Sequence, residues 1–540
     1  MNTTADGEKP ATFAGERLKS GLIRQSLVTA SLVTIGTNVA GRLFGYLREA
    51  TIAGYFGTSA DFDTFILAFT VPELFSFIIF AALPSALIPF MRQTSPGSRS
   101  RLFWEGLFSF VAVFGFVSIM IYLLRAEILA LLAPALCADQ RMLGEKLLTI
   151  LSGFVFFRGM EAYFRACLYD RKHFVVPSLS PIIANVVVLT LMVAYYGELH
   201  IEALAYGWLL AAATLLLMNG VMAVLILKPG WPGRIDLSLV KPLLKATTAV
   251  AAIESVALIY PVVDRFFAAR YLGEGQIAAL RYAAFLVHIP TGMFAAAFAL
   301  ASFPWISDLS APGKADRLQK LYGQSLRLIA FVMLPAAMGI VLFSREIVRV
   351  AFQRGVFDVT SADLTHSPLV FFALGVVFFA AYLFQMRFYY ASASLRRLGL
   401  ILLSMLTMKI IISLALVNSL EQDGLALATS FTWLSGFLVM TLDLHFHRRL
   451  RAGAVLLPFV VRVVPVLAGV GAYWMIMANV WPDIGTHSLW NTFLRLALLG
   501  FSGALLYLLL AALLRLPEPR QLLASISSKI RPSGSPGDLR

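Results

Sequence analysis

Apolar stretches recur along the whole sequence, and each is about as long as the ~20-residue helix that crosses a lipid bilayer. Inside the hydrocarbon core, only helices and closed barrels give every backbone amide and carbonyl a partner. Hydrophobic residues make up 59% of the chain and charged residues 14%, so a soluble fold of this size could not cover its surface with polar groups. We therefore predict an all-α polytopic membrane protein with about 14 transmembrane helices, at residues 26–47, 64–91, 103–124, 147–168, 175–196, 203–227, 242–263, 279–303, 326–344, 368–391, 398–418, 424–445, 456–479 and 492–515.

Positive charge is concentrated in alternate connections between these stretches. Arg396 and Arg397 lie in one connection, whereas the next connection, 419–423, contains no Lys or Arg. Because cytoplasmic loops accumulate Lys and Arg, we predict that both termini face the cytoplasm, with polar tails at 1–24 and 516–540. The formal net charge of +14 then reflects membrane topology, and it requires no nucleic-acid partner.

The sequence contains an internal repeat. Tyr55-Phe56-Gly57 recurs as Tyr271-Leu272-Gly273, and Pro72 recurs as Pro290. Six predicted helices lie between equivalent points, so both copies share one orientation, as in the parallel repeats of some secondary transporters. A proline inside a helix removes a backbone hydrogen bond, so we predict that Pro72 and Pro290 bend helices that line a cavity and serve coupling or gating. The predicted organisation is an N-lobe at 25–228 with helices 1–6, a C-lobe at 229–450 with helices 7–12, and two further helices at 451–515.

Charged side chains within the predicted helices are the main candidates for function. A charge at the bilayer centre costs about 2.5–3.5 kcal/mol on insertion scales, so it usually faces a cavity or a partner. Arg42 and Arg48 lie in or beside the first predicted helix, and Arg158 and Glu161 lie in the fourth. Guanidinium groups bind phosphate oxygens in a bidentate manner, so a cavity lined by arginines suits a phosphate-bearing ligand, whereas a cationic drug would favour carboxylates. Arg158 and Glu161 are spaced i, i+3, so they could instead neutralise one another.

Several functional classes are excluded by what the sequence lacks. It has no nucleotide-binding loop of the form G-x-x-x-x-G-K-[ST], so ATP bound to this chain does not drive transport. Its histidines are scattered, and Cys137 and Cys167 have no metal-ligand spacing. We therefore predict no metal site and no cofactor other than a coupling ion or the membrane potential. The longest predicted outer loop, about 344–367, offers no acid–base constellation, so we predict that the chain is not an enzyme.

At this point the motifs indicate a family. The segment Gly41–Glu49, GRLFGYLRE, resembles the Ser-Arg-x-x-Gly-x-x-Arg-Asp/Glu motif near the start of the MurJ/MviN lipid II flippases. These belong to the wider multidrug/oligosaccharidyl-lipid/polysaccharide exporter superfamily. The resemblance covers about residues 25–515, and further motifs follow in the same order at Phe56–Pro72, Phe174–Asn185, Ile289–Gly292, Phe352–Phe357 and Gly424–Ser430.

The resemblance implies an alternating-access transporter of the cytoplasmic (inner) membrane. Its substrate would be an undecaprenyl-diphosphate-linked saccharide, with lipid II, the peptidoglycan precursor, as the family default, and glycan synthases would be candidate partners. Arg42 and Arg48 match arginines thought to meet the diphosphate, and Asp63 matches an important acidic residue of the second helix. Asp264 matches an acidic position implicated in sodium binding in some relatives, and we predict coupling or gating roles for Glu254, Asp264 and Lys409. Lys409 stands near the position that supplies an Asn ligand there, so its ammonium could take the place of the cation.

The sequence also departs from the family pattern. Ser76 and Phe77 stand where the family usually has paired arginines, and Phe285 replaces an arginine in the eighth helix. These losses lower the positive charge expected in the cavity and leave two alternatives open. One is a flippase for an exopolysaccharide or another lipid-linked repeat unit, and the other is a multidrug antiporter in which Asp63 and Glu254 supply an acidic cavity.

Overall fold

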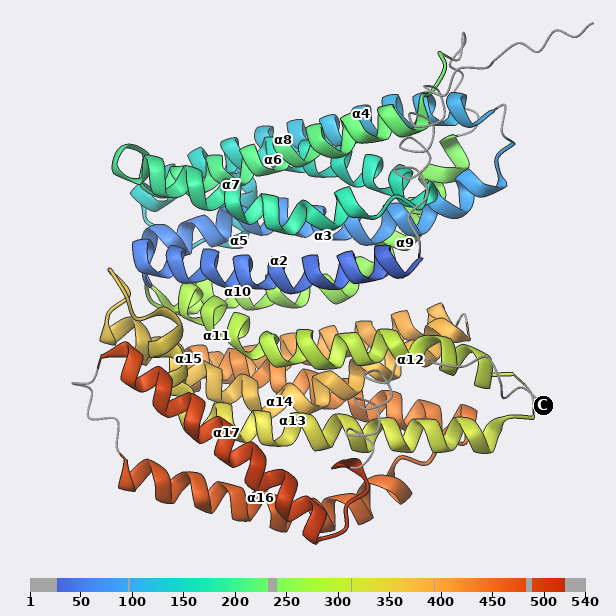
Figure 1. Cartoon of the computed structure of the whole chain (residues 1–540). Coiled ribbons are helices and arrows are strands. Elements are labelled where there is room, and N and C mark those ends of the chain that lie inside the picture. Colours follow the sequence, from blue (N-terminus) through green and yellow to red (C-terminus); the bar gives the residue numbers. More distant parts are fainter. Residues whose placement is uncertain are drawn as a thin grey trace, which may run out of the picture. The chain divides into compact units, whose positions relative to one another are not determined.

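A computed structural model of the chain describes residues 27–95, 98–231, 240–311, 313–392, 394–481 and 488–519, and within these ranges every regular element is a helix. Figure 1 labels them. The predicted tail at 1–24 lies outside the described residues, as does the tail at 516–540 from residue 520 onward. The helices up to residue 271 are α2 (Leu27–Phe56), α3 (Ala60–Gln93), α4 (Arg99–Leu123), α5 (Arg125–Leu132), α6 (Ala138–Asp170), α7 (Val175–Leu199), α8 (Ile201–Leu227), α9 (Val240–Leu258) and α10 (Tyr260–Tyr271).

The second half of the chain continues in the same way. Its elements are α11 (Gln276–Pro290), the π-helical turn η2 (Thr291–Ala295), α12 (Ala296–Leu309), α13 (Ala315–Phe352), α14 (Val359–Ala391), α15 (Leu395–Arg448), α16 (Gly453–Val480) and α17 (Leu489–Leu513). Eleven helical stretches among the described residues are long and apolar enough to cross a membrane. The all-helical membrane architecture is thereby confirmed, while the number of fourteen spans stays a prediction.

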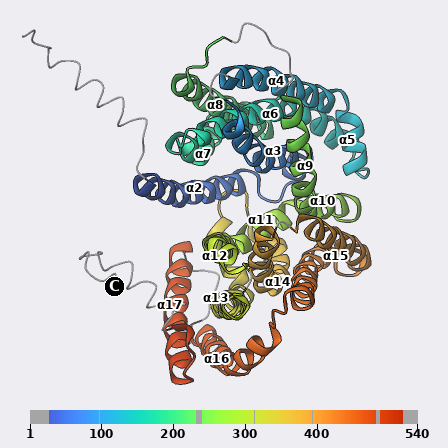
Figure 2. The same cartoon turned by 90° about the vertical axis from the view of Figure 1, so that its right-hand side faces the viewer.

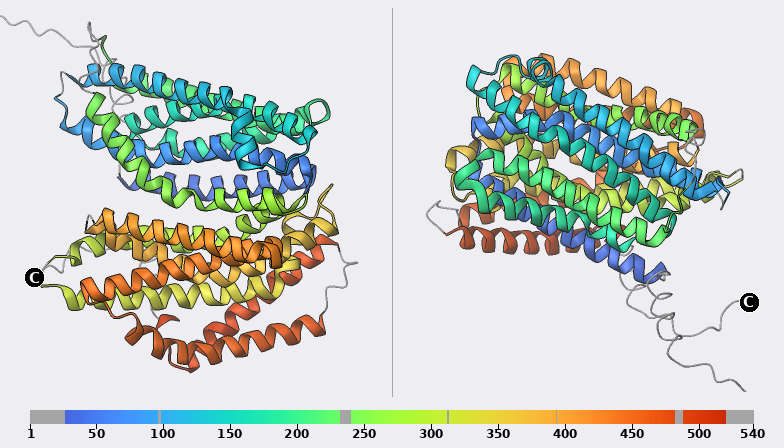
Figure 3. Two further views of the ribbon diagram at one scale, coloured as in Figure 1. Left: turned by 180° about the vertical axis from the view of Figure 1, so that it is seen from behind. Right: turned by 90° about the horizontal axis from the view of Figure 1, so that it is seen from above.

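Contacts between residues divide the chain into two compact units, Met1–Arg270 and Tyr271–Arg540. In the first unit α6 packs against α3, α4 and α8, and α7 packs between α2 and α8. In the second unit α14 packs against α13 and α15, and α16 and α17 pack against α13 (Figures 2 and 3). Residues 229–270, assigned from the sequence to the C-lobe, group with the first unit. The division into repeat lobes stays a prediction.

Three of the predicted stretches lie next to a break in the helical backbone. The stretches at 398–418 and 424–445 are the two halves of α15, and the backbone leaves helical geometry between them at Glu421, with φ 49° and ψ −129°, inside the predicted connection 419–423. Just beyond this kink, a Cβ on Gly424 would lie 2.6 Å from the Leu416 carbonyl oxygen, so only glycine allows the two halves to approach. The stretch predicted at 242–263 is divided between α9 and α10.

Aromatic side chains fill the core of the first unit where α4 meets α6. Phe103, Phe110 and Phe114 of α4 are buried against Tyr163 and Phe164 of α6. The buried Tyr163 hydroxyl donates a hydrogen bond to the Phe103 carbonyl oxygen at 2.6 Å, which satisfies the polar end of an otherwise apolar ring. This packing fixes the position of α6 against α4, and α6 carries the charged residues described below.

In the second unit, a close backbone approach holds α14 against α15. A Cβ on Gly375 would lie 2.6 Å from the Ser430 Cα, and the Ser430 hydroxyl donates to the Phe371 carbonyl oxygen at 2.6 Å. Small residues allow this kind of contact between membrane helices.

We expect Gly375→Ala to lower the free energy of unfolding by about 1–3 kcal/mol, because the added methyl group overpacks the contact. Gly399→Ala is the matched control, since in the described structure a methyl group there meets open space within α15. Thermal unfolding of both variants, purified in detergent, tests the contact. Equal melting temperatures for Gly375→Ala and Gly399→Ala would contradict it.

Candidate functional site

Three charged residues of α6 form the α6 ion cluster, namely Arg158, Glu161 and Arg165. Glu161 is 0% exposed. Its Oε2 accepts a hydrogen bond from Arg158 Nη1 at 3.0 Å, and its Oε1 accepts from Arg165 Nε at 2.9 Å and Nη2 at 2.8 Å. The spacings of three and four residues place all three side chains on one helix face. The predicted pairing of Arg158 with Glu161 is therefore present, and Arg165 shares the same carboxylate.

Residues of three other helices surround the α6 ion cluster. Asn219 of α8 donates to Glu161 Oε1 at 3.1 Å and to the Ser180 hydroxyl of α7 at 3.4 Å. Arg158 Nε donates to the Ser76 hydroxyl of α3 at 3.4 Å. The guanidinium carbons of Arg158 and Arg165 lie 4.0 and 4.5 Å from the centre of the Phe80 ring, also of α3, where the ring attracts a cation. The cluster thus ties α6 to α3, α7 and α8.

The charges of the α6 ion cluster do not cancel. Two guanidinium groups share a single carboxylate, which leaves one positive charge in excess. The side chains of Arg158 and Arg165 are 19% and 15% exposed to solvent, whereas the side chain of Glu161 is fully buried. The buried carboxylate holds both cations in place, and the partly exposed guanidinium groups can bind a further anion.

Arg48 belongs to a separate network. Its Nη1 donates to Asn185 Oδ1 of α7 at 2.6 Å, and its Nη2 forms an ion pair with the buried Glu49 at 2.6 Å. Its guanidinium carbon lies 4.7 Å from the centre of the Trp208 ring of α8, and Asn185 also donates to the Gly41 carbonyl at 3.3 Å. Arg48 therefore joins α2 to α7 and α8, and it does not belong to the α6 ion cluster.

The other two residues predicted to bind substrate lie elsewhere in the first unit. Arg42 is exposed on α2. Asp63 is buried in the first turn of α3, where the positive end of the helix dipole favours a carboxylate. The structure therefore brings Arg158 and Glu161 together, and it gives Arg48, Arg42 and Asp63 different surroundings.

An ion pair that was not predicted connects α10 to α3. Arg265 Nη2 lies 2.8 Å from Glu73 Oε2, and Arg265 Nη1 donates to the Thr70 hydroxyl at 3.1 Å. Pro72 is buried beside this pair inside α3, and the predicted coupling residue Asp264 precedes Arg265 in α10. Arg265 and Glu73 are 192 residues apart in the sequence, and no sequence pattern predicted that they would meet.

Glu254 belongs to α9, but its side chain lies outside the described residues.

In the second unit, two predicted coupling residues occupy distinct sites. Pro290 ends α11 and is followed by η2, a turn of π-helix, a feature that often marks a functional bend. Lys409 is 0% exposed in α15. Its ammonium donates to the Leu425 carbonyl oxygen at 3.1 Å and to the Thr429 hydroxyl at 2.5 Å. Among the described residues, no group of three or more His, Cys, Asp or Glu could hold a metal ion.

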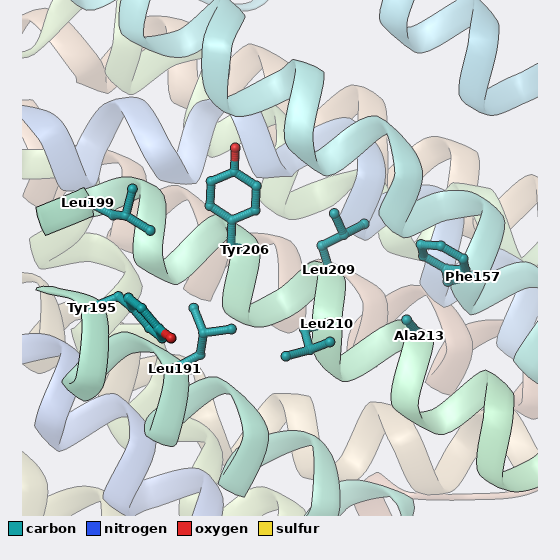
Figure 4. Close-up of a pocket in the computed structure, with 8 residues that line it drawn as sticks. All are labelled: Phe157, Leu191, Tyr195, Leu199, Tyr206, Leu209, Leu210 and Ala213. Atoms are coloured by element: carbon teal, nitrogen blue, oxygen red, sulfur yellow. The ribbon is translucent and has the colours of Figure 1, made fainter.

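The two units also carry apolar grooves. One, of about 600 Å³, lies along α7 and α8 beside α6, and Figure 4 shows its lining residues Phe157, Leu191, Tyr195, Leu199, Tyr206, Leu209, Leu210 and Ala213. Another, of about 390 Å³, lies between α13, α16 and α17 and includes Phe343, Trp474 and Tyr507. Hydrophobic walls of this kind suit contact with lipid chains.

Comparison with known proteins gives a consistent result. The family model described as "Lipid II flippase MurJ" matches residues 52–494. The probable lipid II flippase MurJ of Bdellovibrio bacteriovorus is 25% identical over 499 residues, which cover 89% of this chain and 94% of that protein. The probable lipid II flippase MurJ of Rhizobium tropici is 26% identical over 370 residues, covering 65% and 68%.

Solved structures share the fold at low sequence identity. The lipid II flippase MurJ in an inward closed conformation superposes with a TM-score of 0.76 at 19% identity, covering 92% of this chain and 100% of that chain. An inward-facing multidrug resistance MATE family transporter of the MOP superfamily gives 0.61 at 14% identity, covering 78% and 98%. Because both identities are low, these similarities establish the fold alone.

We expect Glu161→Gln to lower the free energy of unfolding by about 3 kcal/mol, because removing one partner of a buried ion pair leaves the other charges uncompensated. Glu202→Gln is the matched control, since Glu202 pairs with Lys146, whose side chain is 60% exposed, and exposed pairs contribute little. Thermal unfolding in detergent measures both. A smaller loss for Glu161→Gln than for Glu202→Gln would contradict the structural role of the shared carboxylate.

Proposed function

Since the chain belongs to the MurJ family of lipid II flippases, we propose that it moves an undecaprenyl-diphosphate-linked saccharide across the cytoplasmic (inner) membrane by alternating access. Lipid II is the default substrate of the family. Proteins of this family are transporters, so we assign no enzymatic activity to the chain. We assign no cofactor either, and we propose that a coupling ion or the membrane potential drives transport, with glycan synthases as candidate partners. The cytoplasmic orientation of both termini is part of the proposal.

The excess positive charge of the α6 ion cluster carries this proposal. A diphosphate diester is an anion with several oxygen acceptors, and planar guanidinium groups match those oxygens in pairs. In this proposal Glu161 holds Arg158 and Arg165 in place and correctly spaced before substrate arrives, and the diphosphate then binds the partly exposed guanidinium groups. Hydrogen bonds between charged groups contribute about 1.5–3 kcal/mol each.

The remaining predicted site residues take supporting roles in the proposal. Arg48 positions α2 through Asn185 and Trp208. Arg42, which is exposed on the same helix, stays a predicted substrate residue, as does Asp63. Pro72, Pro290, Asp264 and Glu254 stay predicted coupling or gating residues.

The identity of the glycan is the main alternative within the proposal. Ser76 stands where a family arginine was expected, but its hydroxyl accepts a hydrogen bond from Arg158, so a guanidinium group from α6 reaches this position of α3. This contact supports continued recognition of a diphosphate and carries no information on the sugar. A flippase for an exopolysaccharide repeat unit therefore remains the second candidate. The cationic character of the cluster disfavours the multidrug antiporter, which would need an acidic cavity.

We expect expression of the full chain to restore growth in a bacterial strain depleted of its lipid II flippase. Growth would be restored because the chain would transport lipid II in place of the depleted flippase. The growth of the strain after depletion is measured. Membrane localisation of the expressed chain serves as the control. Absence of rescue, combined with loss of exopolysaccharide when the native gene is deleted, would contradict lipid II as substrate and favour the second candidate.

We expect Arg158→Gln and Arg165→Gln each to reduce flipping about 10- to 100-fold, because each loses charged hydrogen bonds to phosphate. Arg345→Gln is the matched control, since Arg345 lies 56% exposed on α13 in an ion pair with Asp363. The rate of lipid flipping, measured for variants with unchanged folding, tests this assignment. Rates equal to that of the control in both variants would remove the cluster from the substrate site.

A further inference from the structure

Lys409 presents a buried cation that the proposed substrate site does not use. It lies in the first half of α15, and its side chain has no solvent exposure. Ionised groups within a membrane helix are kept only where oxygen acceptors or counter-charges surround them. For Lys409 the structure places two oxygen atoms next to the ammonium, the Leu425 carbonyl at 3.1 Å and the Thr429 hydroxyl at 2.5 Å.

Both acceptors come from the second half of α15, beyond the kink at Glu421. Leu425 and Thr429 lie one helical turn apart, and the Thr429 hydroxyl also donates to the Leu425 carbonyl oxygen at 3.1 Å. On the first half, Ser413 lies one turn after Lys409, fully buried, and its hydroxyl has no hydrogen-bond partner among the described residues. Through these two oxygen atoms the ammonium bridges the two halves of α15.

Carbonyl and hydroxyl oxygens of this kind are also ligands for a free monovalent cation. In membrane transporters, helix carbonyls at interrupted helices coordinate Na⁺, and carbonyl oxygens replace the hydration shell of ions in channels. An ammonium has the same unit charge and demands the same acceptors, but it is attached to the chain. We propose that the ammonium of Lys409 is a tethered cation that fills a monovalent-cation site within α15, so that the fold of this unit does not depend on Na⁺.

A tethered charge has a direct consequence for coupling. A free ion can bind on one side of the membrane and leave on the other, whereas the Lys409 ammonium cannot leave the chain. This site therefore cannot couple transport to a Na⁺ gradient. That consequence for transport rests on the proposed flippase function, whereas the occupation of the site by Lys409 does not.

The test compares melting temperatures of the full-length protein, purified in detergent, in NaCl, KCl and choline chloride at equal ionic strength. Wild type should melt at the same temperature in all three salts. Lys409→Asn removes the ammonium and adds a carbonyl oxygen, so it should melt lower in KCl and choline chloride and recover in NaCl with a saturable dependence on Na⁺. Lys409→Met, which fills the space without charge or oxygen, should melt lower in every salt.

Three results would overturn the proposal. One is a response of Lys409→Asn to Na⁺ no larger than that of wild type. Another is a Lys409→Met variant as stable as wild type in KCl. The third is failure to recover folded Lys409→Asn from cells and buffers containing NaCl, because Na⁺ should then replace the missing charge. None of these measurements requires a substrate, so they stand even where the flippase assay fails, and growth complementation by Lys409→Asn with and without Na⁺ tests the transport consequence separately.

Discussion

A charged side chain within the bilayer needs an opposite charge or hydrogen-bond acceptors next to it. In this chain, that requirement determines which helices contact the charged residues of α6 and α15. In the first unit, the carboxylate of Glu161 is shared by Arg158 and Arg165, and hydrogen bonds connect these residues to α3, α7 and α8. In the second unit, the ammonium of Lys409 is held by oxygen atoms across the kink of α15. Buried ion pairs are often no more stabilising than apolar residues of similar volume. Stability alone therefore gives no strong reason for the α6 ion cluster, whereas the proposed binding of a diphosphate gives it a role.

In the proposed function, the excess of cation over anion in the α6 ion cluster links this packing to transport. A flippase must take a diphosphate out of water and release it on the other side, so its site needs positive charge that is available without being fully solvated. In that proposal Glu161 meets this requirement, because it fixes two guanidinium groups while neutralising one. The contact between Arg158 and Ser76 also offers a physical reason why α3 can lack the arginines expected there, since a neighbouring helix supplies the charge.

Much of the fold could be predicted from the sequence, because the predicted apolar stretches coincide with helices of the structure, except that 242–263 is divided between α9 and α10 and 279–303 is interrupted by the π-helical turn η2. The family could also be identified, because its motifs are local. The spacing of Arg158 and Glu161 correctly indicated their pairing, and the same helical spacing would have indicated Arg165. Contacts between distant segments could not be predicted, since periodicity within a helix does not tell which neighbouring helix its face meets. This applies to Arg265 with Glu73 and to Arg48 with Trp208. The break at Glu421 was predicted, because the polar connection 419–423 separates the two apolar stretches that form the halves of α15.

The most direct measurement is transport by the purified chain. Proteoliposomes containing wild-type protein and fluorescent lipid II would be assayed for the exchange of lipid II between leaflets, beside protein-free vesicles and vesicles with an unrelated membrane protein. A flippase of this family should make lipid II accessible from the opposite leaflet faster than in both controls, and an excess of a soluble diphosphate should slow that exchange. Exchange no faster than in protein-free vesicles, with the protein folded and inserted, would contradict the function proposed for this chain.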